Sequence, residues 1–384
     1  MIAYGRHSID QHDLNAVIEV LQSDFLTQGL QVPAFETAMA DYCNAKYTVA
    51  ANSATSCLHL ACLALGLKPG DSVWTSPNTF VASANCALYC GATVDFVDID
   101  PSTYNLCPIA LQAKLKTAAQ HNRLPKIIIA VHFSGQSCDM IAIAKLAQQY
   151  GIKIIEDASH AVGAVYNGKP IGGCQYSDIT VFSFHPVKII TTGEGGMALT
   201  NNQQYANSMS RLRSHGITKD PQQMQGTPDG DWYYQQLDLG FNYRMTDMQA
   251  ALGLSQLGKL DIFLSARRRM AQLYAEQLGH IASIQVPLLN LDSSWHLYVI
   301  QLADKATRNR VFDNLRAKNI GVHVHYIPVH MQPYYQKIGF KIGAFPIAEA
   351  YYQKALTIPL HPSLQPDDTR FIMAELIHAV AQAV

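Results

Sequence analysis

The sequence predicts an α/β fold in which a mostly parallel central sheet is covered by helices and followed by a smaller α+β region. Between residues 47 and 200, short β-branched runs alternate with longer helical stretches, a pattern typical of parallel strands joined by crossover helices. Beyond residue 200, helical segments dominate. We therefore expect a large domain over residues 1–245 and a small C-terminal domain over residues 246–384.

The individual elements follow from these runs. The expected strands of the large domain cover 47–51, 72–77, 93–100, 126–133, 152–159, 178–184 and 196–200, and the expected helices cover 56–67, 82–91, 109–120 and 140–151. The run "KIIIAV" is apolar throughout, as expected of a strand covered on both faces. In the small domain we expect one long helix over 245–279, a strand at 296–302, a helix at 310–320, a strand at 322–328, and a final helix from 366 onwards.

The composition excludes several classes of protein. Of 384 residues, 48% are hydrophobic and 15% charged, and 28 Lys and Arg against 29 Asp and Glu give a net charge of -1. This balance provides no basic surface for nucleic acid or anionic membranes. The start "MIAYGRHSID" has no signal-peptide pattern, and no apolar run reaches the roughly 18 residues of a membrane span. The eight cysteines include no CxxC pair, so we expect reduced thiols and a cytoplasmic location.

Asp157 ends the strongly apolar strand in "IIEDASHA". Ligands of open α/β sheets bind beyond the carboxyl ends of strands, where a carboxylate can pair with a buried cation or a protonated ring nitrogen. By itself, Asp157 could equally be a helix N-cap or a solvated loop acid. A hydrolase triad of Asp157, Ser159 and His160 is rejected, because a triad converges from separate segments and no GxSxG motif is present.

The stretch "NSATSCLHLA" places Ala54, Thr55 and Ser56 between a strand and a helix. The free N–H groups and dipole of a helix N-terminus, together with two hydroxyls, can bind a phosphate without Lys or Arg. Simple N-capping is the alternative. The stretch matches neither a Walker loop nor a GxGxxG fingerprint, which argues against binding of nucleoside triphosphates and dinucleotides.

Lys188 lies in "FSFHPVKIITTGEGG", with apolar residues on both sides and Gly193, Gly195 and Gly196 after it. Most lysines are exposed, but burial of this one would lower the pKa of its amine and favour the neutral, nucleophilic form. The glycines would let the backbone approach a ligand closely. A strand-end aspartate, a phosphate-binding helix terminus and a buried lysine together indicate a site for pyridoxal 5'-phosphate.

The chain resembles the sugar aminotransferases of the DegT/DnrJ/EryC1/StrS family, which have the fold-type I, aspartate aminotransferase-like architecture. The resemblance rests on motifs along nearly the whole chain: "NSATSCLHLA", "SPNTFVASANC", "IIEDASHAVGA", "FSFHPVKIITTGEGG", "LRSHGI" and "GFNYRMTDMQAALGLSQL". Relatives often have glutamine in place of His160 and glycine in place of Ala54. Some have histidine in place of the lysine and act as dehydratases, so the presence of Lys188 favours amino transfer.

The resemblance implies a role for each matching residue. Lys188 would form the Schiff base with pyridoxal 5'-phosphate and shuttle the proton, while Asp157 would pair with the ring nitrogen. The remaining cofactor contacts would come from Thr55, Ser56, Phe80, His160, Ser183 and, from the neighbouring subunit, Asn242. The resemblance also implies which residues would bind the nucleotide-sugar substrate. They are Tyr4 in the N-terminal segment, Leu26, Thr27, Gln28, Gly29, Ser56, Ser183, Asn242, His323, Val324, His325 and Tyr326.

The resemblance also implies an activity. Within the family the chain is most similar to transaminases of pseudaminic acid biosynthesis, so L-glutamate would donate an amino group to C4 of a UDP-linked 4-keto-6-deoxy-N-acetylhexosamine in a homodimer with shared active sites. An aminotransferase for another nucleotide-linked 4-keto sugar, or a regulatory relative without turnover, remains an alternative. His323 and His325 could also be packed strand residues. A metal site is not expected there, since no third ligand is near in the sequence.

Overall fold

The computed structural model describes residues 1–383 and is built around a seven-stranded sheet with the strand order β1-β9-β8-β5-β4-β2-β3. Its strands are β1 (Tyr47–Ala51), β2 (Ser72–Thr75), β3 (Thr93–Phe96), β4 (Ile127–Val131), β5 (Lys153–Asp157), β8 (Ile179–Ser183) and β9 (Gly196–Thr200). The pairs β2–β3, β2–β4, β4–β5 and β5–β8 are parallel, whereas β9 runs antiparallel to β8 and β1. The predicted mixed, mostly parallel α/β sheet is confirmed.

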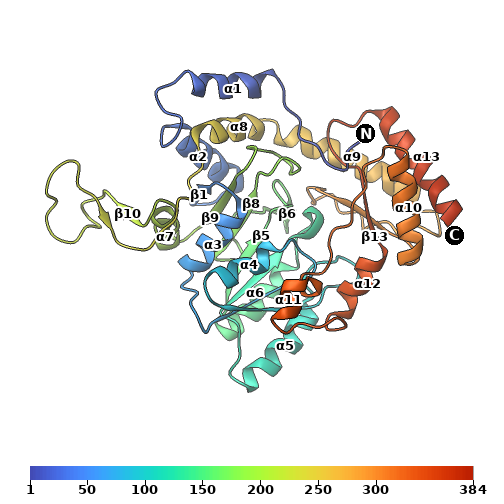
Figure 1. Ribbon diagram of the computed structural model, residues 1–384, viewed down its shortest axis with the longest axis horizontal. Helices are drawn as coiled ribbons and strands as arrows, with labels where there is room; N and C mark the ends of the chain where they lie inside the picture. The colour runs from blue at the N-terminus through green and yellow to red at the C-terminus, as the bar shows by residue number, and fades with distance from the viewer. Residues whose placement is uncertain (384) are drawn as a thin grey trace.

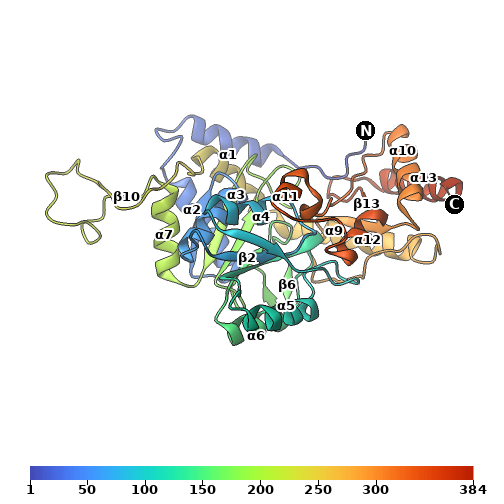
Figure 2. The same cartoon turned by 60° about the horizontal axis from the view of Figure 1, so that its bottom comes forward.

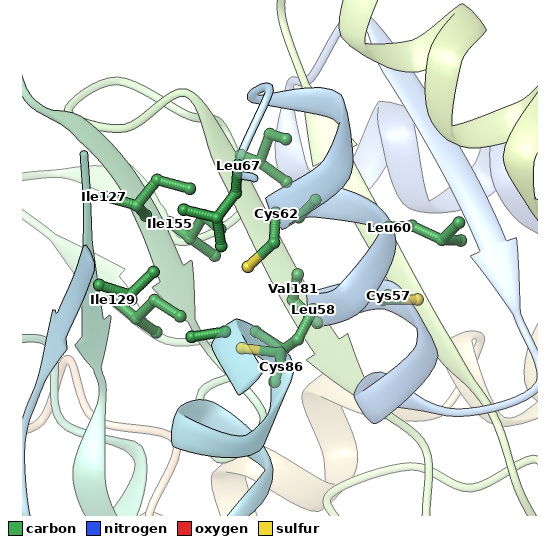
Figure 3. Close-up of a cluster of buried hydrophobic side chains, with 14 of the residues drawn as sticks. Cys57, Leu58, Leu60, Cys62, Leu67, Cys86, Ile127, Ile129, Ile155 and Val181 are labelled. Carbon is green, nitrogen blue, oxygen red and sulfur yellow. The ribbon is translucent and has the colours of Figure 1, made fainter. Parts of the chain in front are cut away.

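Helices cover both faces of this sheet (Figures 1 and 2). They are α2 (Gln31–Cys43), α3 (Ala54–Ala64), α4 (Ala82–Tyr89), α5 (Pro108–Gln120), α6 (Met140–Tyr150) and α7 (Gln203–Arg213), whereas α1 (Gln11–Leu21) packs against α8 (Asp247–Leu257). Alternate side chains of a strand point to opposite faces. Thus Ile127 and Ile129 of β4 pack with α3 and α4, as Figure 3 shows, while Ile128 packs with α5 and α6.

The C-terminal part contains a hydrophobic core of its own, although some of its helices pack into the cores of the large sheet. Its elements are α8 (Asp247–Leu257), α9 (Leu260–Leu278), β12 (Tyr298–Gln301), α10 (Lys305–Ala317), η2 (Val329–Met331), α11 (Pro333–Lys337), α12 (Pro346–Lys354), β13 (Ala355–Ile358) and α13 (Pro366–Ala383). β12 and β13 pair antiparallel, and α9, α10 and α13 pack around them. α8 packs against α1 and α2. The division into domains after residue 245 stays a prediction.

Two of the expected elements are wrong. The single helix over 245–279 is two helices, because α8 ends before Gly258, a residue of low helix propensity, and Lys259 pairs with Asp10 and Asp13 near α1. The expected strand at 322–328 is reduced to one bridge between His323 and Thr357. Beyond that bridge, the phenol of Tyr351 donates a hydrogen bond to the His325 carbonyl oxygen, so a side chain replaces the strand partner.

A few short elements remain: β6 (Val165–Tyr166), β7 (Lys169–Pro170), η1 (Phe133–Gly135), β10 (Ile217–Thr218) and β11 (Gln235–Gln236). Among them, η1 is buried beside the sheet. The chain between β10 and β11 extends away from the rest of the molecule in both ribbon views. Within residues 1–383, none of the helices combines the length and apolar character that crossing a bilayer requires.

Candidate active site

A cavity of about 520 Å³ lies beside the carboxyl ends of β5 and β8 and the N-terminus of α3. Its walls come from side chains within the segments 53–58, 79–82, 157–160, 183–194 and 323–326, with Val131 at the end of β4 and Tyr4 from the N-terminal segment. These segments are distant in sequence, and the sheet brings them together where its parallel strands end. This is the edge at which open α/β sheets bind their ligands.

Lys188 lines this cavity together with Asp157. The loop that carries it is anchored on both sides: its backbone N–H donates to the His185 carbonyl oxygen, and Ile189 and Ile190 after it are buried. Burial of the amine lowers the pKa of Lys188 to about 8, although the negative charge of Asp157 acts in the opposite direction. A much larger fraction of this amine is therefore neutral near pH 7 than of an ordinary lysine.

The lowered pKa of Lys188 predicts how the apoprotein binds an aldehyde. Because only the neutral amine attacks, the rate of imine formation with pyridoxal phosphate should rise about tenfold per pH unit below a pKa of about 8 and level off above it. The rate is measured by stopped-flow absorbance, with the Lys188→Ala protein as the background. A rate that keeps rising through pH 10 would contradict the lowered pKa.

Asp157 is held in one orientation at the end of β5. Its Oδ2 accepts a hydrogen bond from Ser83 Oγ at 2.6 Å, and its Oδ1 accepts from Ser159 N–H at 3.1 Å and Ser159 Oγ at 2.6 Å. The side chain is almost fully buried yet faces the cavity. The Ser159 hydroxyl donates to the Asp157 carboxylate, and the two nitrogens of His160 are bonded to Ser134 and Tyr326 instead of to Ser159. The nucleophile–base contact of a hydrolase triad is therefore not formed.

The N-terminus of α3 forms another wall of the cavity. Ser53 is the N-cap and accepts a hydrogen bond from the Ser56 N–H at 3.1 Å. Ser53, Ala54 and Thr55 line the cavity, whereas Ser56 is buried and its hydroxyl donates to Asn52 Oδ1 at 2.6 Å. A Cβ on Gly196 would lie 2.4 Å from the Ala54 nitrogen, so only glycine allows this close approach.

The structure brings most of the expected site residues together. Besides Lys188 and Asp157, the cavity is lined by Tyr4, Thr55, Phe80, His160, Ser183, His323, His325 and Tyr326. Phe80 lies on the rim of the cavity and is 59% exposed. Tyr4 packs against His323 and His325, with ring centroids 5.5 Å and 5.3 Å apart. The N-terminal segment and the segment after α10 therefore meet at one side of the cavity.

Other expected residues lie elsewhere in the chain's own fold. Neither Ser56 nor Val324 lines the cavity. Leu26, Thr27 and Gln28 are exposed, and the Gly29 N–H donates to Asp247 Oδ2 at 2.6 Å, beside a separate small pocket near Arg213 and Arg244. Asn242 is also exposed and pairs with Ser214.

Several lining residues were not predicted from the sequence. They are Ser53, Leu58, Thr79, Ala82, Val131, Ser159, His185, Val187 and Glu194. The N-cap position of Ser53, directly before the expected helix, could have identified it. His185 and Glu194 flank Lys188 within the same motif, and their side chains approach to 4.0 Å at the mouth of the cavity.

The chain matches the sequence profile of a known family over residues 7–377, the DegT/DnrJ/EryC1/StrS aminotransferase family. It is 40% identical to the spore coat polysaccharide biosynthesis protein SpsC of Bacillus subtilis, over 100% of this chain and 97% of that protein. It is 38% identical to a UDP-4-amino-4,6-dideoxy-N-acetyl-beta-L-altrosamine transaminase of Campylobacter jejuni (97% and 96%) and 37% identical to the GDP-perosamine synthase of Caulobacter vibrioides (98% and 97%).

Solved structures with the same fold extend this similarity. PseC of Helicobacter pylori, described as an aminotransferase involved in the biosynthesis of pseudoaminic acid, superposes with a TM-score of 0.91 at 30% identity and 99% coverage of both chains. The sugar aminotransferase Spr1654 of Streptococcus pneumoniae, described as putative and solved in a PMP form, superposes with a TM-score of 0.92 at 28% identity and 100% coverage of both chains.

Proposed function

Because the chain belongs to the DegT/DnrJ/EryC1/StrS family and is a pyridoxal 5'-phosphate-dependent nucleotide-sugar aminotransferase, we propose that it makes UDP-4-amino-4,6-dideoxy-N-acetyl-β-L-altrosamine. L-Glutamate donates the amino group to C4 of the UDP-linked 4-keto-6-deoxy-N-acetylhexosamine and leaves as 2-oxoglutarate. The similarity to the Campylobacter jejuni transaminase and to PseC supports this substrate. The observation that carries the proposal is the Lys188 amine, with its pKa lowered by burial, beside Asp157 in the cavity.

The residues present fit the cofactor. The cavity contains a nucleophilic amine, a fixed carboxylate and a helix N-terminus, and Gly196 leaves the backbone of that terminus accessible. When bound, pyridoxal phosphate supplies an electrophilic carbon for amines and a ring that accepts electron density from the carbon that loses a proton. The amine thus matches the aldehyde of the cofactor, the carboxylate matches its ring nitrogen, and the helix N-terminus matches its phosphate.

We assign the following work to the chain's own residues. Lys188 binds the cofactor and then, as a neutral amine, takes a proton from one carbon and returns it to another. Asp157 keeps the ring nitrogen protonated, since a carboxylate stabilises an adjacent cation. The α3 N-terminus, Thr55 and Ser183 hold the phosphate. Phe80 and His160 pack on the ring, and Tyr4 with residues 323–326 binds the sugar.

A homodimer with shared active sites is part of the proposal. Asn242 and residues 26–28 are exposed, and with Gly29 they lie outside their own chain's cavity, as expected of residues that act in a neighbouring subunit. Ser56, whose hydroxyl is engaged by Asn52, is assigned to the support of the α3 N-terminus. A cytoplasmic location and the domain division after residue 245 belong to the same proposal.

Asn242→Ala is expected to weaken cofactor retention by about ten- to a hundredfold, because one hydrogen bond to a charged phosphate contributes roughly 1.5–3 kcal/mol. The release of pyridoxal phosphate on dilution, followed by its absorbance, measures this effect. Asn207→Ala, which changes an exposed asparagine on α7, is the matched control and should retain the cofactor. An unchanged cofactor affinity in Asn242→Ala would argue against a cross-subunit phosphate contact.

A second substrate remains a candidate, because the GDP-perosamine synthase is nearly as similar to this chain as the altrosamine transaminase. Precursors of perosamine, bacillosamine or 4-amino-arabinose type sugars are therefore the alternative acceptors. A regulatory relative without turnover is disfavoured by the intact Lys188 and Asp157. Such a protein would show no loss of the cofactor's visible band with L-glutamate alone.

A panel of nucleotide-linked 4-keto sugars tests the substrate. The enzyme is incubated with L-glutamate and each sugar, and the aminosugar formed is identified by mass spectrometry and NMR. We expect the UDP-linked 4-keto-6-deoxy-N-acetylhexosamine to give the highest kcat/KM. A higher value for a GDP-linked sugar or a UDP-linked pentose would replace this substrate with the alternative.

A further inference from the structure

His160 and Tyr326 form a hydrogen-bonded pair in the wall of the cavity that contains Lys188. Nε2 of His160 lies 3.1 Å from Oη of Tyr326. The other ring nitrogen, Nδ1, accepts a hydrogen bond from the backbone N–H of Ser134 at 3.2 Å. Both nitrogens of His160 are therefore engaged by groups of the protein.

The backbone of Ser134 holds this N–H in place. Ser134 has a φ of 64°, in the left-handed region, and its hydroxyl donates to the Leu297 carbonyl oxygen at 2.9 Å. The His296 N–H in turn donates to the Ser134 carbonyl oxygen at 2.9 Å. A backbone N–H can only donate, so this arrangement requires Nδ1 of His160 to be an acceptor without a proton.

The tautomer of His160 follows from this contact. The pKa of His160 lies well below its usual value, because the ring is buried and Lys188 and His325 are near, so the ring is neutral. A neutral imidazole carries one proton, and with Nδ1 unprotonated that proton is on Nε2. Nε2–H therefore donates to Tyr326 Oη, and the phenol accepts in this contact.

The proton of Tyr326 is then available to another acceptor. Within residues 1–383, the Tyr326 hydroxyl forms a hydrogen bond with His160 alone. Burial raises the pKa of Tyr326, so the phenol keeps its proton. Its ring is fixed between Phe80 and Phe133, with centroids 6.4 Å and 6.2 Å away. The O–H can thus point to a molecule in the cavity.

We propose that Tyr326 donates a hydrogen bond to an oxygen acceptor of the molecule that reacts at Lys188, and that His160 is the positioning residue that fixes this polarity. The inference rests on the proposed function of the site. The acceptor is either the carbonyl oxygen of the keto substrate or the ring oxygen of the cofactor. A donor aimed at an oxygen that gains negative charge stabilises it, and loss of one such donor typically costs about a hundred- to a thousandfold in rate.

Three variants separate polarity from packing. Tyr326→Phe removes the donor. In His160→Gln, the side-chain oxygen can accept from Ser134 and the amide can donate to Tyr326, so the polarity is kept. In His160→Glu, the carboxylate accepts from Tyr326, so the phenol proton turns away from the cavity. Tyr104→Phe is the matched control, because Tyr104 Oη accepts from Gln301 Nε2 at 2.6 Å outside this cavity.

Two measurements distinguish the acceptors. The first is the pH titration of the visible absorbance of the holoenzyme without substrate. The second is the single-turnover rate of the pyridoxamine form with 2-oxoglutarate, a keto acid whose use does not depend on the identity of the sugar. If the acceptor is the cofactor oxygen, Tyr326→Phe moves the titration midpoint to higher pH. If it is the substrate carbonyl, the midpoint stays and the 2-oxoglutarate rate falls at least tenfold.

Either result supports the proposal when the same quantity changes at least tenfold more in His160→Glu than in His160→Gln. That quantity is the acid dissociation constant of the absorbance titration if the acceptor is the cofactor oxygen, and the 2-oxoglutarate rate if it is the substrate carbonyl. It is overturned if Tyr326→Phe matches the wild type in both measurements, or if the glutamine and glutamate variants behave alike. Should His160→Glu fail to fold, Tyr326→Phe against Tyr104→Phe decides. A wild type without any 2-oxoglutarate reaction would refute the proposed function, while the absorbance titration would still test the contact of Tyr326 with the cofactor.

Discussion

Lys188→Ala is expected to abolish amino transfer, with a rate at least a thousandfold below that of the wild type. The substitution removes both the amine that binds the cofactor and the base that moves the proton, and loss of a general base alone typically costs a hundred- to ten-thousandfold. Lys188 is the lysine among the cavity-lining residues, and burial lowers its pKa to about 8. The rate is measured as the loss of the cofactor's visible band with L-glutamate in a single turnover.

Lys188→Arg is the matched control for this prediction. It keeps a long cationic side chain in the same apolar pocket, but a guanidinium stays protonated and is not a nucleophile at neutral pH. We expect it to be as inactive as the alanine variant. In the wild type, borohydride should abolish the visible band and add the mass of the reduced cofactor at Lys188. Normal turnover in Lys188→Ala would contradict the mechanism.

Asp157→Asn is expected to lower the rate with L-glutamate by about a hundred- to a thousandfold. An amide has no negative charge to keep the ring nitrogen protonated, and breaking a buried ion pair typically costs 3–5 kcal/mol. The same change disturbs the hydrogen bonds from Ser83 and Ser159, so the side chain would also lose its fixed orientation. Single-turnover kinetics at a saturating cofactor concentration report the rate without the effect of weaker binding.

Asp178→Asn controls for the loss of an aspartate next to the same sheet, because Asp178 directly precedes β8. Asp178 Oδ1 pairs with Lys153 at 2.8 Å outside the cavity, so its substitution should lower stability slightly and leave the rate intact. If Asp157→Asn retained the wild-type rate to within twofold, Asp157 would not be the partner of the ring nitrogen.

The sheet and much of the site could be predicted because the signals are local. Strands such as 126–133 follow from continuous apolar runs, the helices between them follow from their helical period, and Asp157 and Lys188 lie in short motifs with distinctive neighbours. The strand order and the convergence of Tyr4 with His323 and His325 depend on long-range packing. The resemblance to a family, rather than the pattern of residues, placed those three residues at the site.

The errors have physical causes. Residues 245–279 have a continuous helical period, and the break at Gly258 depends on the tertiary contact of Lys259 with α1. The alternation of His323 and His325 predicted a strand, yet their rings lie 4.6 Å apart on a segment with a single bridge. Helix position alone also does not determine the orientation of the Ser56 hydroxyl, which donates to the nearby Asn52; the expected role of Ser56 at the site stays a prediction.

The transfer of a labelled amino group tests the central claim most directly. The enzyme is incubated with nitrogen-labelled L-glutamate and the UDP-linked 4-keto-6-deoxy-N-acetylhexosamine, and the products are analysed by mass spectrometry and NMR. The account predicts that the label appears on C4 of the sugar with one 2-oxoglutarate formed per aminosugar, and that the Lys188→Ala protein forms neither. An unlabelled sugar, or label transfer that persists without Lys188, would contradict it.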